Sequence, residues 1–167
     1  MDMDKLAAVR QRVALLKIPA LLDALPAYLD SVDGGIVIYC YHRAVLTALM
    51  ERIQAAHPDV RMAEVHGGVG MTERDQIIRA FQAGSIKIIC ATIGALREGV
   101  NLTEGEMLIF MEYDWTPANM EQAIGRLHRR GQDRTVHVHF FAFTDGIDRY
   151  IDRVLKRKKS DIKKIMQ

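Results

Sequence analysis

Short apolar runs alternate with longer stretches of helical periodicity along most of the chain. The apolar runs suit buried strands and lie at 36–40, 62–65, 87–91, 107–111 and 135–143. Between them, apolar residues recur every three or four positions at 44–56, 74–81 and 119–129, which predicts helices with one buried face. Because strands that alternate with helices form βαβ units, we expect an α/β fold. Its mainly parallel sheet, of about six strands, should carry helices on both faces.

The chain also has a helical segment at each end. Residues 4–31 carry two apolar stripes at helical spacing, and Pro19 and Pro26 are expected to break or restart that helix. A further helix is expected from Ile147 onwards. These patterns divide a single domain into a helical lead-in (1–34), a main lobe (35–146) and a basic C-terminal helix (147–167).

Two local signals are expected to bound the helix over 74–81. Thr72 is a candidate N-cap, because its hydroxyl can accept a hydrogen bond from a backbone N–H of the first turn. Gly84 is expected to close the helix, because glycine adopts the left-handed backbone conformation that ends many helices.

The composition is that of a soluble globular protein, with 49% hydrophobic and 26% charged residues. No run of 18 apolar residues occurs, so we expect no membrane partner. Cys40 and Cys90 lie within apolar runs and are predicted to be buried free thiols of a reducing compartment. No Cys/His cluster has the spacing of metal ligands, so we expect no metal site.

The charge is distributed unevenly along the chain. The formal net charge is +2, but residues 151–167 alone carry +5, which leaves −3 for the rest. A basic terminal segment can attract nucleic acid by neutralising phosphates. It can equally be a solvated helix end, since cations suit a helix C-terminus. The sequence favours neither interpretation.

The segment from Gln122 to Gln132 carries the strongest chemical signal. Arg126 and Arg129 stand three positions apart, and residues at that spacing share one face of a helix. Two guanidinium groups on one face form a permanently charged clamp for phosphate oxygens. Such a clamp can stabilise the charge that develops on a transferring γ-phosphoryl group. The alternative is a solvated basic stretch.

The other polar stretches follow predicted strands. They lie at Tyr41–Arg43, His66–Gly70, Thr92–Asn101 and Tyr113–Pro117. In open parallel sheets the functional loops lie beyond the carboxyl ends of the strands, so these stretches are expected at one edge of the sheet.

Together these residues resemble the second RecA-like lobe of superfamily 2 helicases and translocases, and within that group the SNF2 family. Among SNF2 proteins the chain is most similar to the distant branch that includes the HARP-type annealing helicases. Gly125 and Arg130 stand where SNF2 proteins usually have aspartate and an aliphatic residue. The matching blocks are Gly35–Arg43 (motif IV), Ala91–Thr103 (motif V), Asp114-Trp-Thr-Pro117 and Gln122–Gln132 (motif VI).

The resemblance implies roles for individual residues. Arg126 and Arg129 match the motif VI arginines that reach ATP on the other lobe, and act as arginine fingers. Gln122 of motif VI and the motif V turn with Glu98, Gly99 and Asn101 match positions near the nucleotide. Thr92, Tyr41, His42 and Gly67 match positions that face nucleic acid.

Three of the four nucleic-acid contacts have a plainer alternative. Thr92 could be only an N-cap, Gly67 a turn glycine and His42 a surface histidine. Trp115 is predicted to be a packing anchor rather than a stacking platform.

Half of an ATP site is absent from the sequence. No Gly-x-x-x-x-Gly-Lys-[Ser/Thr] run is present to hold phosphates, and no Asp-Glu-x-His or Asp-Glu-x-Asp motif to hold magnesium. The resemblance therefore implies that ATP and Mg²⁺ bind mainly to an N-terminal RecA-like lobe of the same parent protein. The isolated chain is expected to be inactive.

The expected partners are that N-terminal lobe and duplex DNA, contacted through phosphates. The expected location is nuclear in a eukaryote, and cytoplasmic on the nucleoid in a bacterium or virus. An RNA helicase lobe and a stand-alone nucleic-acid-binding module remain alternatives.

Overall fold

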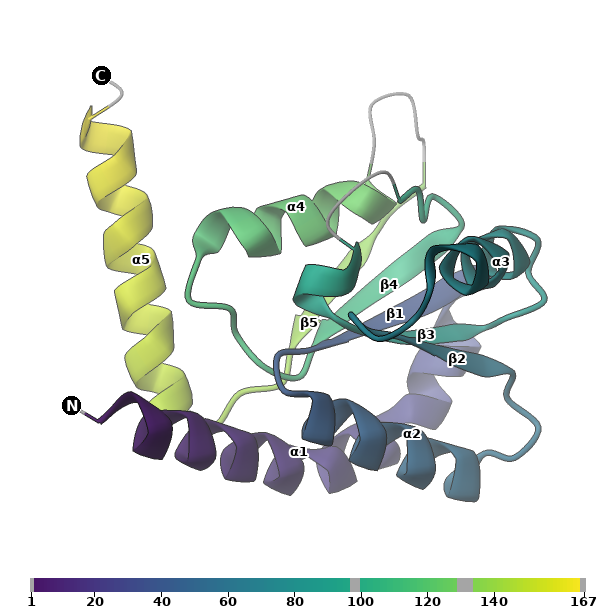
Figure 1. The fold of residues 1–167 in the computed structure, drawn as a ribbon, viewed down its shortest axis with the longest axis horizontal. Coiled ribbons are helices and arrows are strands. Elements are labelled where there is room, and N and C mark those ends of the chain that lie inside the picture. The colour runs from purple at the N-terminus through teal and green to yellow at the C-terminus, as the bar shows by residue number, and fades with distance from the viewer. Residues whose placement is uncertain (1, 97–99, 129–133, 166–167) are drawn as a thin grey trace.

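The computed structural model describes residues 2–96, 100–128 and 134–165, with side chains described up to residue 159. Strands and helices alternate along this part of the chain (Figure 1). The elements in order are α1 (Met3–Ser31), β1 (Gly35–Cys40), α2 (Arg43–Ala56), β2 (Met62–Val65), α3 (Met71–Gln82), β3 (Ile88–Thr92), the 3₁₀ helix η1 (Ile93–Leu96), β4 (Gly105–Phe110), α4 (Pro117–Leu127), β5 (His137–Phe140) and α5 (Ile147–Ile165).

The strands form one sheet in the order β2-β3-β1-β4-β5, and every pair of neighbours is parallel. The predicted α/β fold with a parallel sheet is thereby confirmed. About six strands were expected, whereas the described residues contain five. β1 lies at the centre, with Ile38 beside Cys90 of β3 on one side and Ile109 of β4 on the other.

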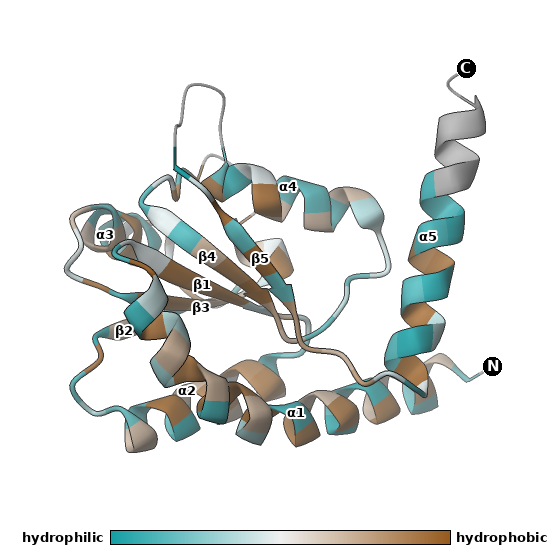
Figure 2. Ribbon diagram, turned by 180° about the vertical axis from the view of Figure 1, so that it is seen from behind, coloured by the Kyte–Doolittle hydropathy of each residue, from teal (hydrophilic) through white to brown (hydrophobic). Residues whose placement is uncertain are grey.

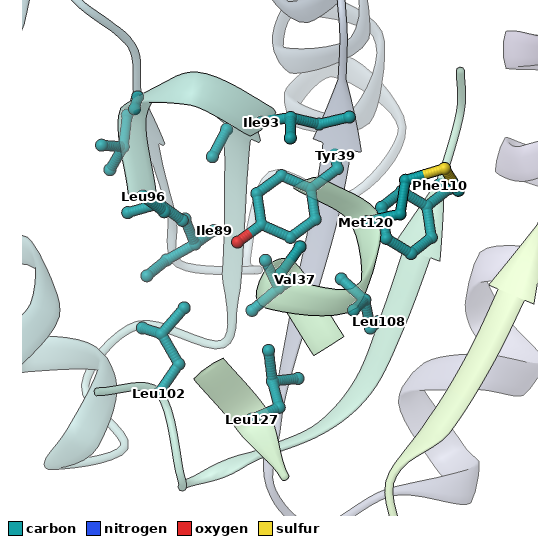
Figure 3. Packing of buried hydrophobic residues seen from close by; sticks show 14 of the residues in the cluster. Val37, Tyr39, Ile89, Ile93, Leu96, Leu102, Leu108, Phe110, Met120 and Leu127 are labelled. Atoms are coloured by element: carbon teal, nitrogen blue, oxygen red, sulfur yellow. The ribbon is translucent and has the colours of Figure 1, made fainter. Parts of the chain in front are cut away.

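Helices cover both faces of the sheet, with α3, η1 and α4 on one face and α1 and α2 on the other (Figures 1 and 2). All six residues of β1 are buried. Val37 and Tyr39 point into the cluster under α3, η1 and α4, which Figure 3 shows from close by. Ile36 and Ile38 point into the cluster under α1 and α2. Because successive side chains of a strand point to opposite faces, β1 contributes to both hydrophobic clusters.

Helix α1 runs without a break through Pro19 and Pro26, so the predicted interruption is wrong. Proline removes a hydrogen bond and costs a helix roughly 3 kcal/mol. Both prolines lie on the exposed side, while Ile18, Leu21 and Leu25 are fully buried. Burying each such side chain contributes about 1.5–3 kcal/mol, so packing of this face offsets the cost of the two prolines.

Helix α3 begins earlier than expected. Its N-cap is Gly70, in an extended conformation, and Thr72 lies inside the first turn, so the predicted N-cap is wrong. Glycine is an acceptable N-cap, and Glu73 adds a favourable negative charge to the first turn. The predicted end is confirmed, since Gly84 follows the C-cap residue with φ of 75°.

The two cysteines are buried free thiols, as predicted. Burial raises the pKa of both thiols well above the ordinary value; Cys90 and Glu112 add to this effect at Cys40, and Lys17 opposes it. No helix in the described part of the chain is long and apolar enough to cross a membrane.

A buried ion pair joins the two terminal helices. Nζ of Lys17 in α1 lies 3.1 Å from Oδ2 of Asp148 in α5, and the two side chains are only 4% and 6% exposed. The same carboxylate oxygen accepts the backbone N–H of Phe143 at 3.0 Å. Because a buried charge is costly without a partner, the pair fixes where α5 leaves the body of the lobe.

Replacing Lys17 by methionine should lower the free energy of unfolding by about 3–5 kcal/mol, because it leaves the Asp148 carboxylate buried without its cation. Urea denaturation measures the loss. The double variant Lys17→Met/Asp148→Asn should recover most of it, since no buried charge remains and the asparagine oxygen can still accept the Phe143 N–H. The control is Lys156→Met, which removes an exposed pair with Asp152 and should cost less than about 1 kcal/mol. Equal losses in Lys17→Met and Lys156→Met would contradict the prediction.

Candidate functional site

The residues predicted to face nucleic acid lie at one edge of the sheet. Tyr41 and His42 follow β1, Gly67 lies in the loop after β2, and Thr92 is the last residue of β3. These three strands are neighbours, and the pairing places Thr92 beside Cys40, next to Tyr41. The structure thus brings all four predicted residues to the carboxyl edge. Tyr41 and Gly67 are exposed, while His42 and Thr92 are half-buried.

A buried carboxylate organises the loop between β1 and α2. Oε2 of Glu112, just beyond β4, accepts the backbone N–H groups of Tyr41 at 2.8 Å and His42 at 2.9 Å. Its Oε1 lies 2.6 Å from Nδ1 of His42. The side chain of Glu112 is only 3% exposed. Three hydrogen bonds offset the cost of burying this charge, and in return they fix the loop.

Helix α1 reaches the same edge through Arg10. Its guanidinium donates to the backbone carbonyl of Tyr113 and lies 4.4 Å from the centre of the Tyr41 ring and 4.9 Å from that of Trp115. Arg10 is only 5% exposed. A desolvated guanidinium between two aromatic rings is a favourable cation–π arrangement. It supports the predicted packing role of Trp115.

The loop after β2 is held by a histidine. The backbone N–H of Gly68 donates to Nδ1 of His66 at 2.9 Å, so the ring proton of His66 lies on Nε2, 3.7 Å from a carboxylate oxygen of Glu64. A Cβ added to Gly68 would lie 3.0 Å from this ring and 3.5 Å from Nη1 of Arg43. A Cβ on Gly67 would meet nothing within 4 Å. Gly67 therefore faces open space, where a ligand's phosphate has room to approach.

The start of α4 is set by Asp114. Its carboxylate accepts the backbone N–H of Thr116 at 2.7 Å and the side-chain amide of Asn119 at 3.0 Å. Pro117 occupies the first turn of the helix, as its fixed φ favours. The Asp-Trp-Thr-Pro block thereby orients the helix that carries Gln122 and Arg126.

Helix α4 ends at Leu127, one residue beyond Arg126. Leu127 is fully buried and packs against Gly105, where a Cβ would come within 2.8 Å of it. His128 is the C-cap and has an extended backbone. Leu127 is thus the last buried residue of the helix. That Arg126 and Arg129 share one helical face stays a prediction, because Arg129 lies outside the described residues.

The residues predicted to lie near nucleotide come from α4 and from the segment before β4. Arg126 is half-buried, whereas Gln122 and Asn101 are exposed. The backbone N–H of Leu102 donates to the backbone carbonyl of Arg126 at 3.0 Å, which joins the two segments. Arg129, Glu98 and Gly99 lie outside the described residues.

Arg126 also influences the core beneath it. Burial raises the pKa of the Tyr39 hydroxyl well above its ordinary value, and the positive charge of Arg126 acts in the opposite direction. Tyr39 is fully buried in the cluster of Figure 3. The Arg126 charge therefore lies close enough to the buried Tyr39 hydroxyl to act on it.

The described residues fit only part of an ATP site. The Arg126 guanidinium and the Gln122 amide are donors suited to phosphate oxygens. In the described ranges, no three His, Cys, Asp or Glu side chains gather as a metal site. The described residues thus offer donors for phosphate oxygens but no cluster of metal ligands.

Sequence reasoning missed two residues at the carboxyl edge. Glu112 had an available signal, because a carboxylate directly after the apolar run 107–111 falls where parallel strands end. Arg10 had none, since its partners Tyr113, Tyr41 and Trp115 are distant in sequence and belong to other elements.

Comparison with known proteins identifies the family of this chain. The family model for the helicase conserved C-terminal domain matches residues 16–131. TATA-binding protein-associated factor BTAF1 of Arabidopsis thaliana is 31% identical over 129 residues, or 75% of this chain and 6% of that protein. Human DNA annealing helicase and endonuclease ZRANB3 is 25% identical over 149 residues, or 89% of this chain and 14% of that protein.

A SWI/SNF-related regulator of chromatin, subfamily A-like protein 1, from Drosophila melanogaster is 27% identical over 146 residues. This match covers 85% of the chain and 19% of that protein, so the chain spans less than a fifth of each of these relatives. The solved C-terminal part of the Fun30 ATPase domain superposes with a TM-score of 0.76 at 24% identity, covering 83% of this chain and 44% of that one. The chain belongs to the helicase conserved C-terminal domain family and is the C-terminal RecA-like lobe of an SNF2-type helicase.

Proposed function

We propose that this lobe is one half of an ATP-driven motor that moves along duplex DNA. In this proposal the N-terminal RecA-like lobe of the same protein holds ATP and Mg²⁺. The present lobe closes on that nucleotide with Arg126, Arg129 and Gln122 of motif VI and with Glu98, Gly99 and Asn101 of motif V. The observation that carries the proposal is the bond between Leu102 and Arg126, because it joins the two motifs at one place on the surface.

The role assigned to the arginines is electrostatic. Charge spreads over the γ-phosphoryl oxygens as the group transfers, and a guanidinium placed beside them stabilises that charge. Arg126 suits this role because its side chain is half-buried and its backbone is fixed by Leu102. A preorganised donor loses little freedom when the lobes close.

The role assigned to the carboxyl edge is contact with DNA phosphates. This edge offers the hydroxyl of Thr92, the rings of Tyr41 and His42, and the open protein backbone at Gly67. Such groups suit contact with the phosphates of DNA rather than recognition of its bases. A translocase has to pass every base, so contacts without sequence preference fit the motion. We propose a nuclear location in a eukaryote and a nucleoid-associated one in a bacterium or virus.

An RNA helicase lobe is the competing proposal. Stimulation of ATP hydrolysis by duplex DNA, single-stranded DNA and RNA, measured on the two-lobed parent protein, separates the two. The DNA proposal requires duplex DNA to be the strongest activator. A third possibility, a non-catalytic binding module, requires that the parent gene encode no P-loop upstream of this lobe.

In the two-lobed protein, Arg126→Ala and Arg129→Ala should each lower kcat for ATP hydrolysis by roughly 10³, with a smaller effect on nucleotide binding. Arg126→Lys should be impaired as well, because lysine lacks the planar fork of donors. Arg79→Ala on the exposed side of α3 is the matched control and should keep the parental rate. Steady-state kinetics and a thermal melt check rate and folding together. Parental turnover in both alanine variants would remove the arginine-finger assignment.

The isolated 167-residue chain should not hydrolyse ATP, because phosphate donors without a phosphate-binding loop and metal ligands cannot hold the reacting geometry. A coupled phosphate-release assay at micromolar protein, with and without duplex DNA, tests this. Mixing in the N-terminal lobe should restore activity. Turnover by the chain alone that survives repurification would contradict the prediction.

The basic tail should add long-range attraction to DNA. Lys158 donates to the Trp115 carbonyl at 2.8 Å and Lys159 lies 2.8 Å from Glu121, so deleting 156–167 also removes contacts with the start of α4. Neutralising Arg153, Lys156 and Arg157 to glutamine keeps the helix and removes charge. Both changes should weaken duplex binding and lower the salt slope, by about 0.9 for each lost phosphate contact. The control is Arg52→Gln/Arg61→Gln. An unchanged salt slope in the neutralised tail would show only a solvated helix end.

A further inference from the structure

The side chain of Glu112 is a buried charge that core packing does not require. Pairing between β4 and β1 continues to Met111, whose backbone N–H donates to the Tyr39 carbonyl at 2.9 Å. Glu112 is the next residue, so its carboxylate arrives beside Tyr41 and His42. An apolar residue would avoid the cost of desolvating a carboxylate, but it would leave the Tyr41 and His42 N–H groups without this acceptor.

The carboxylate fixes the imidazole of His42 as well as the loop backbone. Oε1 lies 2.6 Å from Nδ1, and the His42 side chain is 15% exposed. The second ring nitrogen, Nε2, lies on the other side of the ring from the bond to Glu112. Nε2 has no hydrogen-bond partner in the part of the chain that the structure describes. One nitrogen is thus held by the protein, and the other remains available to a ligand.

The chemistry of the dyad selects an anionic acceptor. A phosphate oxygen accepts hydrogen bonds only, as does the ionised Glu112 carboxylate. If both ring nitrogens donate, one to each acceptor, the ring carries two protons and a positive charge. Hydrogen bonds between charged groups are the shorter and stronger kind. A phosphate contact at Nε2 therefore requires the imidazolium form.

We infer that Glu112 is a positioning residue that holds His42 for contact with a nucleic-acid phosphate, and that this contact takes up one proton on His42. The inference rests on the proposed DNA contact at the carboxyl edge. It adds Glu112 to that site, and it makes the binding of nucleic acid dependent on pH.

The charged groups around His42 come from several elements. Glu112 lies beyond β4, Arg10 stacks on the Tyr41 ring from α1, and Arg43 follows His42 in α2. The Tyr41 ring contacts the imidazole edge-on, with the ring centres 5.1 Å apart. The charge of Lys17 in α1 acts on Cys40, the last residue of β1. His66 and Glu64 lie on the neighbouring part of the edge, at the end of β2. Among these groups, His66 is the other side chain whose ordinary titration falls between pH 5 and 8.

The competing interpretation is that Glu112 only anchors the backbone of the loop. Glu112→Gln separates the two, because the amide oxygen can still accept the Tyr41 and His42 N–H groups while the negative charge is lost. The amide NH₂ would donate to Nδ1 of a neutral His42. Backbone anchoring then survives, and the requirement for the imidazolium does not.

The test is duplex DNA binding by the 167-residue chain, followed by fluorescence anisotropy from pH 6 to pH 8 at constant ionic strength. For the wild-type chain Kd should fall by roughly tenfold as the pH is lowered across this range, the scale expected for uptake of one proton. Glu112→Gln and His42→Asn should each flatten this dependence. His57→Asn, at the far end of α2, is the matched control and should keep the wild-type slope.

Each outcome decides the inference. A wild-type slope in His42→Asn overturns it, and so does Glu112→Gln that binds more weakly at every pH with an unchanged slope. If Glu112→Gln fails to fold by circular dichroism, His42→Asn decides alone. A wild-type chain that does not bind duplex DNA at any pH overturns the proposed DNA contact and this inference together. Failure of the inference alone leaves binding intact and its pH dependence unchanged in the variants.

Discussion

Burial of the central strand on both faces is the constraint from which the rest of the lobe follows. Every residue of β1 is enclosed, because helices cover the sheet on both sides. A central strand enclosed in this way leaves charged side chains no place along its length, so near the centre of the sheet they lie where the strands end. Thr92, His42 and Glu112 all stand at that boundary. The carboxyl edge is chemically rich because the interior of the sheet must be apolar.

The N-terminal helix contributes more than a lead-in to the lobe. Arg10 ties α1 to the rings of Tyr41 and Trp115, and Lys17 ties it to Asp148 of α5. Both cations are nearly fully buried, and a buried cation is tolerated only where its partners are in place. Helix α1 can therefore dock in one register. That register fixes the Tyr41 side of the carboxyl edge and the direction in which α5 leaves the lobe. Figure 2 shows α5 as a mostly hydrophilic helix leaving the body from this junction.

The sequence predicted the elements that depend on local patterns and missed those that depend on distant contacts. The apolar runs located the strands, and the positions after them located the carboxyl-edge residues, because a strand's face and end follow from its own period. The break expected at Pro19 and Pro26 was wrong, because helix propensity does not include the stabilisation from the buried face of α1. Arg10 could not be found because its partners come from elsewhere in the chain.

One packed path joins the carboxyl edge to the C-terminal end of α4. From Thr92 the chain enters η1, whose Ile93 and Leu96 are buried in the same cluster as Tyr39 (Figure 3). Leu102 returns to that cluster and binds the Arg126 carbonyl. Packed interiors have low compressibility, so a shift at Arg126 cannot be absorbed between α4 and the sheet. The carboxyl edge and the C-terminal end of α4 therefore move as one body. In the motor proposed above, an ATP-driven step would arise at the junction between the lobes, where domains move most easily, and this lobe would follow as a rigid unit.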